Sequence, residues 1–136
     1  EETFNLPHVV ASAGATFVAR WTAYHVKQLA KTMGEALAKK GFRFIEIIAP
    51  CPTLYLRRNR LGEGLEEMKY YQEKSVIKNG ADTKDVGIDY REEIIVGKFL
   101  DVERPTLEEA MEKRMSEALG AKYVKYQQPG KMSPRV

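Results

Sequence analysis

The sequence predicts an α/β fold in which helices flank a parallel sheet. Three segments near the amino terminus carry this prediction. Residues 16–21 are β-prone, residues 24–40 repeat apolar side chains at helical spacing, and residues 42–48 form an apolar run rich in isoleucine. A strand, a helix and a second strand make a βαβ unit, whose crossover is right-handed and whose two strands run parallel in one sheet.

A short helix precedes the first of these strands. Asn5 is a suitable N-cap, and Pro7 is tolerated in the first turn of a helix over residues 5–13. Gly14 stands where that helix has to stop, because glycine readily adopts the left-handed conformation that follows a helix end.

The second helix and the strand after it supply the expected core. Thr22 is placed to cap the helix over residues 24–40, and Gly41 is placed to end it. The strand over residues 42–48 is apolar enough to be buried on both faces. The expected inward face of the helix consists of Val26, Leu29, Ala30, Met33, Ala36 and Leu37.

The rest of the chain predicts two more helices and one more strand. Residues 65–76 are expected to be helical, residues 78–90 to form an exposed connection with room for a short helix, and residues 93–100 to form a third strand. The side chains expected to point inward from the first of these helices are Leu65, Met68 and one of Tyr70 and Tyr71.

The last helix has the clearest end signals. Thr106 is its expected N-cap, Glu108 and Glu109 stand in a first turn where carboxylates suit the helix dipole, and Gly120 ends it near residue 119. The polar tail over residues 121–136 is expected to wrap a partner or to stay mobile.

The composition excludes several classes of protein. The 136 residues suffice for about one domain, and 43% hydrophobic with 30% charged residues is typical of a globular chain. A net charge of +3 is too small and too dispersed to indicate a nucleic-acid partner. The single cysteine excludes an internal disulfide and fits the cytoplasm. No apolar run approaches the ~20 residues of a membrane span, and these residues contain no apolar stretch of the signal-peptide type.

That single cysteine, Cys51, is the principal candidate site residue. It lies between Pro50 and Pro52, directly after the second predicted strand. Proline fixes its own φ and biases the preceding residue toward extended backbone, so the thiol is held in one direction. The carboxyl ends of parallel strands are where ligands gather in such sheets. Three interpretations remain open: a metal or cluster ligand, a nucleophile, or an inert buried thiol.

Several short segments occur together in an order that is typical of one family. They are 7–10 (PHVV), 14–21 (GATFVARW), 27–29 (KQL), 40–46 (KGFRFIE), 50–53 (PCPT) and, more weakly, 92–99 (EEIIVGKF). On these segments the chain resembles the carboxyl-terminal half of the beta subunit of 2-oxoacid:ferredoxin oxidoreductases, most closely the 2-oxoglutarate type. The strong part of the resemblance covers residues 6–61.

The resemblance implies a fold and an activity. Residues 1–120 would form the carboxyl-terminal half of a thiamine-diphosphate-binding pyrophosphate domain, followed by the tail over residues 121–136. The enzymes of this family decarboxylate a 2-oxo acid oxidatively with coenzyme A and pass two electrons to ferredoxin. The implied partners are an alpha subunit, further subunits of the same enzyme, ferredoxin and coenzyme A. No nucleic acid and no membrane are among them.

The resemblance also implies a role for Cys51 as one ligand of a [4Fe–4S] cluster, which four thiolates hold. Arg57, Arg58 and Arg60 follow closely and are expected to stabilise its thiolate. The other three cysteines, and the Gly-Asp-Gly…Asn motif that binds thiamine diphosphate with Mg²⁺, are absent from the chain. We therefore assign it no catalytic and no cofactor-binding residue, and expect a longer polypeptide or another chain to supply them. The alternative is a non-catalytic assembly or docking subunit that keeps the fold.

The remaining candidates have ordinary alternatives. The three arginines are suited to the phosphates of coenzyme A, a dicarboxylic substrate or an acidic ferredoxin, and equally to a solvated loop or a subunit interface. His8 and His25 could activate a nucleophilic thiol only if folding placed one of them beside it. The aromatic residues Trp21, Tyr70 and Tyr71 are expected in the core or in an interface.

Overall fold

The computed structural model describes residues 3–60, 62–89 and 92–125. The chain forms two compact units, Glu1–Arg104 and Pro105–Val136, and each is described by itself below. Residues 126–136, most of the expected tail, lie outside the described residues. The sequence predicts a boundary between a domain over residues 1–120 and a tail over residues 121–136. That domain would be part of a longer protein, so the boundary stays a prediction.

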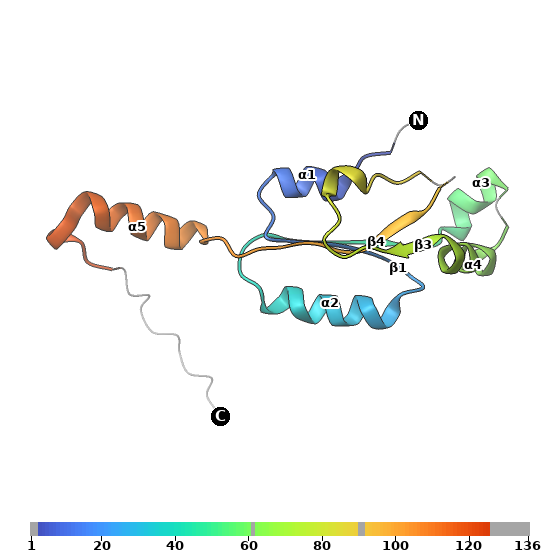
Figure 1. The fold of residues 1–136 in the computed structure, drawn as a ribbon, viewed down its shortest axis with the longest axis horizontal. Helices are drawn as coiled ribbons and strands as arrows, with labels where there is room; N and C mark the ends of the chain where they lie inside the picture. The colour runs from blue at the N-terminus through green and yellow to red at the C-terminus, as the bar shows by residue number, and fades with distance from the viewer. Residues whose placement is uncertain (1–2, 61, 90–91, 126–136) are drawn as a thin grey trace, which may run out of the picture. The chain divides into compact units, whose positions relative to one another are not determined.

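The first unit is built on a four-stranded sheet with the order β2-β1-β4-β3 (Figure 1). Strands β1 (Phe17–Thr22) and β2 (Arg43–Ile48) are parallel and run in register from Phe17 opposite Arg43 to Thr22 opposite Ile48. Helix α2 (Val26–Ala38) connects them. The predicted βαβ unit is therefore confirmed.

The prediction of a wholly parallel sheet is wrong. Strand β4 (Ile94–Asp101) pairs antiparallel with β1, with Arg20 opposite Gly97 and a register shift between Val18 and Ala19. Strand β3 (Ser75–Ile77) pairs parallel with β4, so the sheet is mixed. The apolar pattern of a strand has the same period in either direction, and it therefore predicts a strand without predicting its orientation.

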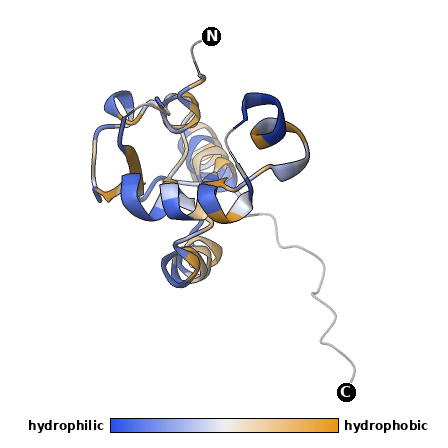
Figure 2. Ribbon diagram, turned by 90° about the vertical axis from the view of Figure 1, so that its right-hand side faces the viewer, coloured by the Kyte–Doolittle hydropathy of each residue, from blue (hydrophilic) through white to orange (hydrophobic). Residues whose placement is uncertain are grey.

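Helices cover both faces of this sheet. Helix α1 (Leu6–Ser12) lies on one face and α2 on the other (Figure 1). The Asn5 side chain caps α1 by accepting a hydrogen bond from the His8 N–H at 3.3 Å, as predicted. Hydrophilic and hydrophobic residues alternate along the helices (Figure 2).

The predicted cap of α2 and much of its predicted inward face are wrong. Thr22 belongs to β1, and His25 is the N-cap residue. The helix buries Thr32 and Ala36, whereas Val26 and Leu37 are 65% and 81% exposed. The reason lies in the sheet: the Trp21 indole donates a hydrogen bond to the Thr32 hydroxyl at 2.9 Å, which places this polar residue inward.

The second predicted strand was expected to be buried on both faces, and this is wrong as well. In the part of the chain that the structure describes, β2 pairs only with β1 and forms one edge of the sheet. Ile47 is 44% exposed, and of the six residues of β2 only Ile48 is buried. An apolar run indicates a strand suited to the interior of a sheet, but the neighbours decide whether it is covered.

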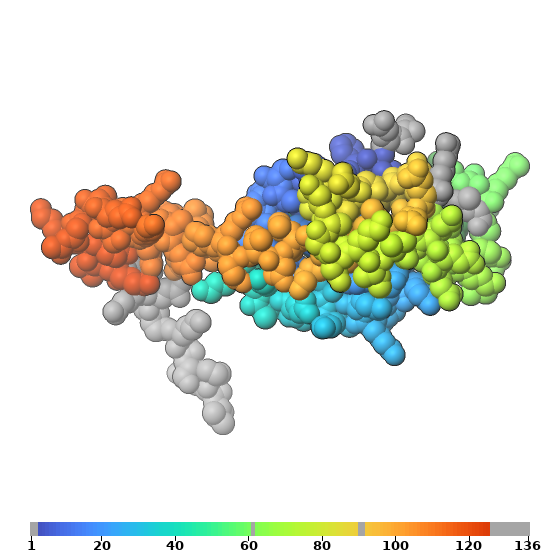
Figure 3. Space-filling model, in the orientation of Figure 1, coloured from blue at the N-terminus to red at the C-terminus, as the bar shows by residue number. Residues whose placement is uncertain are grey.

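Between β2 and β4 the chain forms short helical segments. These are η1 (Pro52–Leu56), α3 (Arg57–Asn59), α4 (Gly64–Lys74) and η2 (Thr83–Asp85). Helix α4 directs Met68 and Tyr71 to the core as predicted, whereas Leu65 is 68% exposed. The helix also ends earlier than predicted, because Ser75–Ile77 forms β3. The connection between β3 and β4 contains η2 and occupies much of the facing surface of this unit (Figure 3).

The second unit contains α5 (Leu107–Leu119) and η3 (Gly120–Lys122). Both end signals of α5 are confirmed. The Thr106 hydroxyl accepts a hydrogen bond from the Glu109 N–H at 3.2 Å, and the Glu109 carboxylate accepts one from the Thr106 N–H at 2.9 Å. Gly120 takes a positive φ of 51° at the end of the helix. Among the described residues, no helix is both long and apolar enough to cross a bilayer.

Candidate functional site

Cys51 lies in a loop that begins directly after β2. Its backbone has φ −117° and ψ 81°, in line with the extended conformation that the following Pro52 favours. Pro52 opens η1, and the Leu56 N–H donates a hydrogen bond to the Cys51 carbonyl oxygen at 3.2 Å. The Leu56 side chain is fully buried, so it anchors this short turn to the core. The two prolines and this anchor hold the cysteine backbone on both sides.

Cys51 is exposed in the described part of the chain. Its pKa is lowered from the ordinary value chiefly by the backbone N–H of Tyr55, then by that of Leu54, with a smaller contribution from the Thr53 side chain. These groups act at the start of a helical turn, where N–H groups point toward a negative charge. The side chain makes no close capping hydrogen bond. The sulfur is therefore exposed, and it loses its proton more readily than an ordinary cysteine does.

The arginines do not have the role expected from the sequence. Arg57, Arg58 and Arg60 follow Cys51 and are exposed, but the lowering of its pKa comes from the backbone and Thr53. Arg60 takes a left-handed φ of 55° after α3, a conformation that is unusual for a residue with a side chain. The Asn59 side chain closes the same turn by donating to the Tyr55 carbonyl oxygen at 2.8 Å. The turn thus offers three solvated cations close to Cys51 in the chain.

The two histidines are held by threonine side chains. His25 is buried, and its Nδ1 lies 2.8 Å from the Thr22 hydroxyl. Burial lowers the pKa of His25, so the neutral imidazole is favoured. The Nδ1 of His8, on α1, lies 3.1 Å from the Thr83 hydroxyl. Each histidine thus has a structural role, as the hydrogen-bond partner of a threonine side chain.

The aromatic candidates belong to the core, as expected. Trp21 is 5% exposed and Tyr71 is 1% exposed, and both lie in one apolar cluster with Ile48 at the end of β2. Tyr70 packs against the same cluster. The cluster therefore supports the strand end from which the Cys51 loop departs.

The described residues provide one exposed cysteine and no complete metal site. No group of three or more His, Cys, Asp or Glu side chains that could hold a metal ion occurs in residues 3–60, 62–89 and 92–125. An exposed sulfur with a fixed backbone and a lowered pKa fits the contribution that one cysteine makes to an iron–sulfur cluster. The sequence did not predict that the N–H groups of Tyr55 and Leu54 would lower the pKa of Cys51. The signal for them is Pro52, because a proline is common at the first position of a helix, where backbone N–H groups have no partner within the helix.

Comparison with known proteins relates the chain to one kind of enzyme subunit. The chain matches no protein-family model. It is 40% identical over 107 residues to 2-oxoglutarate synthase subunit KorB of Methanothermobacter marburgensis, and 40% identical over 114 residues to the same subunit of Methanocaldococcus jannaschii. The chain is homologous to KorB.

The match to the KorB relatives covers most of this chain but less than half of theirs. It includes 79% of this chain and 37% of the M. marburgensis subunit, and 83% of this chain and 42% of the M. jannaschii subunit. A shorter stretch of 42 residues is 48% identical to a 2-oxoacid:ferredoxin oxidoreductase subunit beta of Saccharolobus solfataricus, covering 31% of this chain and 14% of that subunit.

A solved structure has the same fold as this KorB homologue. The 2-oxoglutarate:ferredoxin oxidoreductase of Magnetococcus marinus, with 2-oxoglutarate, coenzyme A and succinyl-CoA bound, matches with a TM-score of 0.64. The match covers 93% of this chain and 42% of that chain, at 22% sequence identity. It supports the α/β fold with a mixed sheet.

Proposed function

We propose that this chain is part of the beta subunit of a 2-oxoglutarate:ferredoxin oxidoreductase, and that Cys51 supplies one thiolate to a [4Fe–4S] cluster. The single observation that carries the cluster assignment is the presentation of the sulfur. It is exposed at the carboxyl end of β2, and the N–H groups of Tyr55 and Leu54 favour its charged form. The homology to KorB supports the identity of the subunit.

The complete enzyme would convert a 2-oxo acid and coenzyme A into an acyl-CoA and carbon dioxide. The two electrons released would reduce two ferredoxin molecules by one electron each. The M. marinus enzyme has 2-oxoglutarate, coenzyme A and succinyl-CoA bound, which supports 2-oxoglutarate as the substrate class here. Thiamine diphosphate, Mg²⁺ and three cluster ligands would be held by residues outside this chain.

When bound, an iron–sulfur cluster supplies one-electron transfer. The residues of this chain contribute to that chemistry in two ways. The Cys51 loop fixes one ligand and directs amide dipoles at its sulfur, and such dipoles favour the more negative state of a cluster. The exposed guanidinium groups of Arg57, Arg58 and Arg60 form a positive surface next to Cys51 in the chain, and this surface suits an acidic electron acceptor.

The test is the substitution Cys51→Ser in the complete enzyme. We expect fewer iron atoms per subunit, loss of the visible absorbance and paramagnetic resonance of the cluster, and loss of ferredoxin reduction. Thiamine-diphosphate binding should remain, because its groups lie elsewhere. The matched control is Ala49→Ser, which adds the same hydroxyl two residues earlier in the exposed loop and should leave the cluster intact.

An unchanged cluster in the Cys51→Ser enzyme would contradict the ligand assignment. A complex that contains this chain but has neither iron nor thiamine diphosphate would instead favour the non-catalytic assembly subunit.

A further inference from the structure

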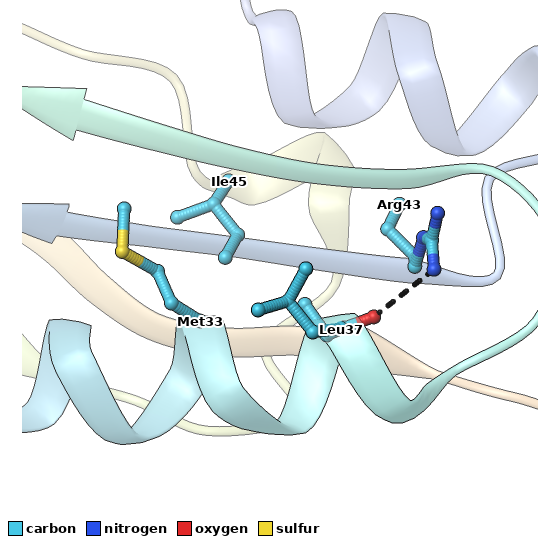
Figure 4. Close-up of a pocket in the computed structure, with 5 residues that line it drawn as sticks. Met33, Leu37, Arg43 and Ile45 are labelled. Carbon is cyan, nitrogen blue, oxygen red and sulfur yellow. Dashed lines mark hydrogen bonds between the residues drawn. The ribbon is translucent and has the colours of Figure 1, made fainter. Parts of the chain in front are cut away.

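The two edges of the sheet differ in the chemistry of their exposed groups. Beside β2, an apolar groove of about 400 Å³ is lined by Met33, Ala36, Leu37, Arg43 and Ile45. Figure 4 shows Met33 and Leu37 of α2 facing Ile45 of β2, and Arg43 donates to the Ala36 carbonyl oxygen at 3.4 Å. The lining is apolar apart from Arg43, which is thus engaged. The edge at β3 instead exposes polar groups that can react with one another.

The pairing of β3 with β4 continues beyond the end of β3 through a side chain. The Lys78 N–H donates a hydrogen bond to the Val96 carbonyl oxygen at 2.9 Å. Next, the Asn79 side-chain oxygen accepts one from the Lys98 N–H at 2.9 Å, and the Gly80 N–H donates one to the Lys98 carbonyl oxygen at 2.8 Å. Asn79 and Gly80 therefore hold both backbone groups of Lys98.

Asn79 and Gly80 form an Asn-Gly sequence, which is prone to deamidation because asparagine is chemically labile and glycine has no side chain to hinder the reaction. The Gly80 backbone nitrogen attacks the Asn79 side-chain carbonyl carbon, the new C–N bond closes a succinimide ring, and ammonia leaves. Water then opens the ring at either of its carbonyl groups. The products are an aspartate, or an isoaspartate whose main chain runs through the former side chain.

The fold withholds both reacting groups from this reaction. The attacking Gly80 nitrogen has to lose the proton that it donates to the Lys98 carbonyl oxygen, and the Asn79 carboxamide has to leave the Lys98 N–H. Both hydrogen bonds must therefore break before the ring can close. Because such local opening has its own free energy, the folded chain should react only in the fraction of time that this turn is open.

The two products fit the turn differently, because the turn lies very close to β4. A Cβ atom built at Gly97 would lie 2.9 Å from the Asn79 side-chain oxygen and 3.2 Å from the Lys78 carbonyl carbon. The aspartate product keeps the length of the main chain and an oxygen that can accept from the Lys98 N–H. The isoaspartate product adds a methylene group to the main chain and displaces that oxygen. In so little space it loses the hydrogen bonds to Lys98.

We propose that Asn79 is a latent site of deamidation, which its pairing with Lys98 holds closed and which becomes reactive when the edge at β3 opens. The isoaspartate product then prevents the turn from closing again, so that a transient opening becomes permanent. Ring closure needs only the two residues themselves, and hydrolysis needs only water, which the exposed position of Asn79 admits. None of these steps depends on the proposed function.

The first test compares the folded and the unfolded chain. The intact complex is incubated at neutral pH with and without a denaturing concentration of urea, and mass spectrometry of the peptide that contains Asn79 measures the loss of its amide. We expect deamidation at least ~10-fold slower in the folded complex, which corresponds to an opening free energy of ~1.4 kcal/mol or more. Equal rates in the two states would overturn the proposal.

The second test opens the turn in the folded chain. In Gly97→Ala the added methyl group displaces the Asn79 carboxamide, and we expect faster deamidation than in the wild type. The matched control is Gly87→Ala in the connection between β3 and β4, because a Cβ atom there would have no atom within 4 Å and the rate should not change. A Gly97→Ala complex with native circular dichroism and the wild-type rate would overturn the proposal. If this variant does not fold, the first test decides.

The third test concerns the products. After deamidation in urea and refolding, the two product forms are separated, and exchange of the Lys98 amide with solvent deuterium is measured in each. The aspartate form should protect this amide as the unmodified chain does, and the isoaspartate form should exchange it at least ~10-fold faster. Equal protection in both forms would contradict the permanent opening.

Discussion

At the scale of single residues, Arg20 shows how a charged side chain becomes part of the core. It is fully buried in β1, and its Nε lies 2.6 Å from a carboxylate oxygen of Glu46. One terminal nitrogen donates to the Val86 carbonyl oxygen at 2.5 Å, and the guanidinium carbon lies 5.8 Å from the centre of the Phe99 ring. Arg20 therefore joins β1 to β2 and to the connection that precedes β4.

The substitution Arg20→Met should destabilise the protein strongly. It leaves the Glu46 carboxylate, 14% exposed, without its cation, and removal of one partner from a buried pair costs about 3 kcal/mol or more. Denaturant unfolding followed by circular dichroism measures the change. Lys27→Met on exposed α2 surface is the control and should alter the free energy of unfolding by less than about 0.5 kcal/mol. Equal effects of the two substitutions would contradict this role.

At the same scale, the sequence predicted the presentation of Cys51 but not the groups that act on its sulfur. The flanking prolines are local signals, and the structure confirms a thiol at the start of a turn after β2. The N–H groups of Tyr55 and Leu54 lower the pKa of the thiol because η1 turns them toward the start of this short helical segment. The expectation that the arginines stabilise the Cys51 thiolate was wrong, because closeness in the sequence does not determine where a long side chain points.

At the scale of elements, the ends of α1 and α5 were predicted best. Asn5, Thr106 and Gly120 act where the sequence placed them, because caps are made by residues a few positions apart. The inward face of α2 was predicted less well. The spacing of apolar residues in α2 also includes Val26 and Leu37, which are exposed. Only the packing of α2 against β1 decides which side of the helix is buried.

The cap of α5 can be tested within its own unit. Thr106→Ala should destabilise the first turn of α5 by about 1 kcal/mol, because the Glu109 N–H loses its acceptor. Amide hydrogen exchange at Glu109 measures the effect, and Thr106→Ser should restore most of the protection. Ser116→Ala is the control, since that hydroxyl donates to the Lys113 carbonyl oxygen at 2.8 Å within the helix. If Glu109 exchanged equally in Thr106→Ala and the wild type, the cap would contribute nothing.

At the scale of the whole molecule, ion pairs connect parts of the first unit that are far apart in the sequence. Asp101, in the last position of β4, lies 2.6 Å from the amine of Lys39, after α2, and 2.7 Å from that of Lys98. These two lysines lower the pKa of Asp101, with Lys39 the larger cause. Burial lowers the pKa of His25 at the other end of α2.

These two pKa shifts predict how stability depends on pH. The depressed pKa of Asp101 stabilises the fold above its unfolded value near ~3.9, and this contribution is lost as the pH falls through the folded pKa. The neutral His25 makes the fold lose stability as the pH falls below ~6.5, because the unfolded chain then takes up a proton more readily. Solvent screening limits the Asp101 contribution to about 1 kcal/mol.

Unfolding free energies measured from pH 7 to pH 3 test both contributions. Asp101→Asn should flatten the lower part of the profile, and His25→Gln should flatten the part just below ~6.5. A wild-type profile that is level between pH 7 and pH 5 would contradict the effect of His25.

The sequence by itself determined the βαβ unit, the caps of α1 and α5 and the loop that presents Cys51, because each depends on residues that are close together in the chain. Tertiary structure decided the antiparallel direction of β4, the position of β2 at an edge and the burial of Arg20. Each of these depends on which distant segment lies alongside.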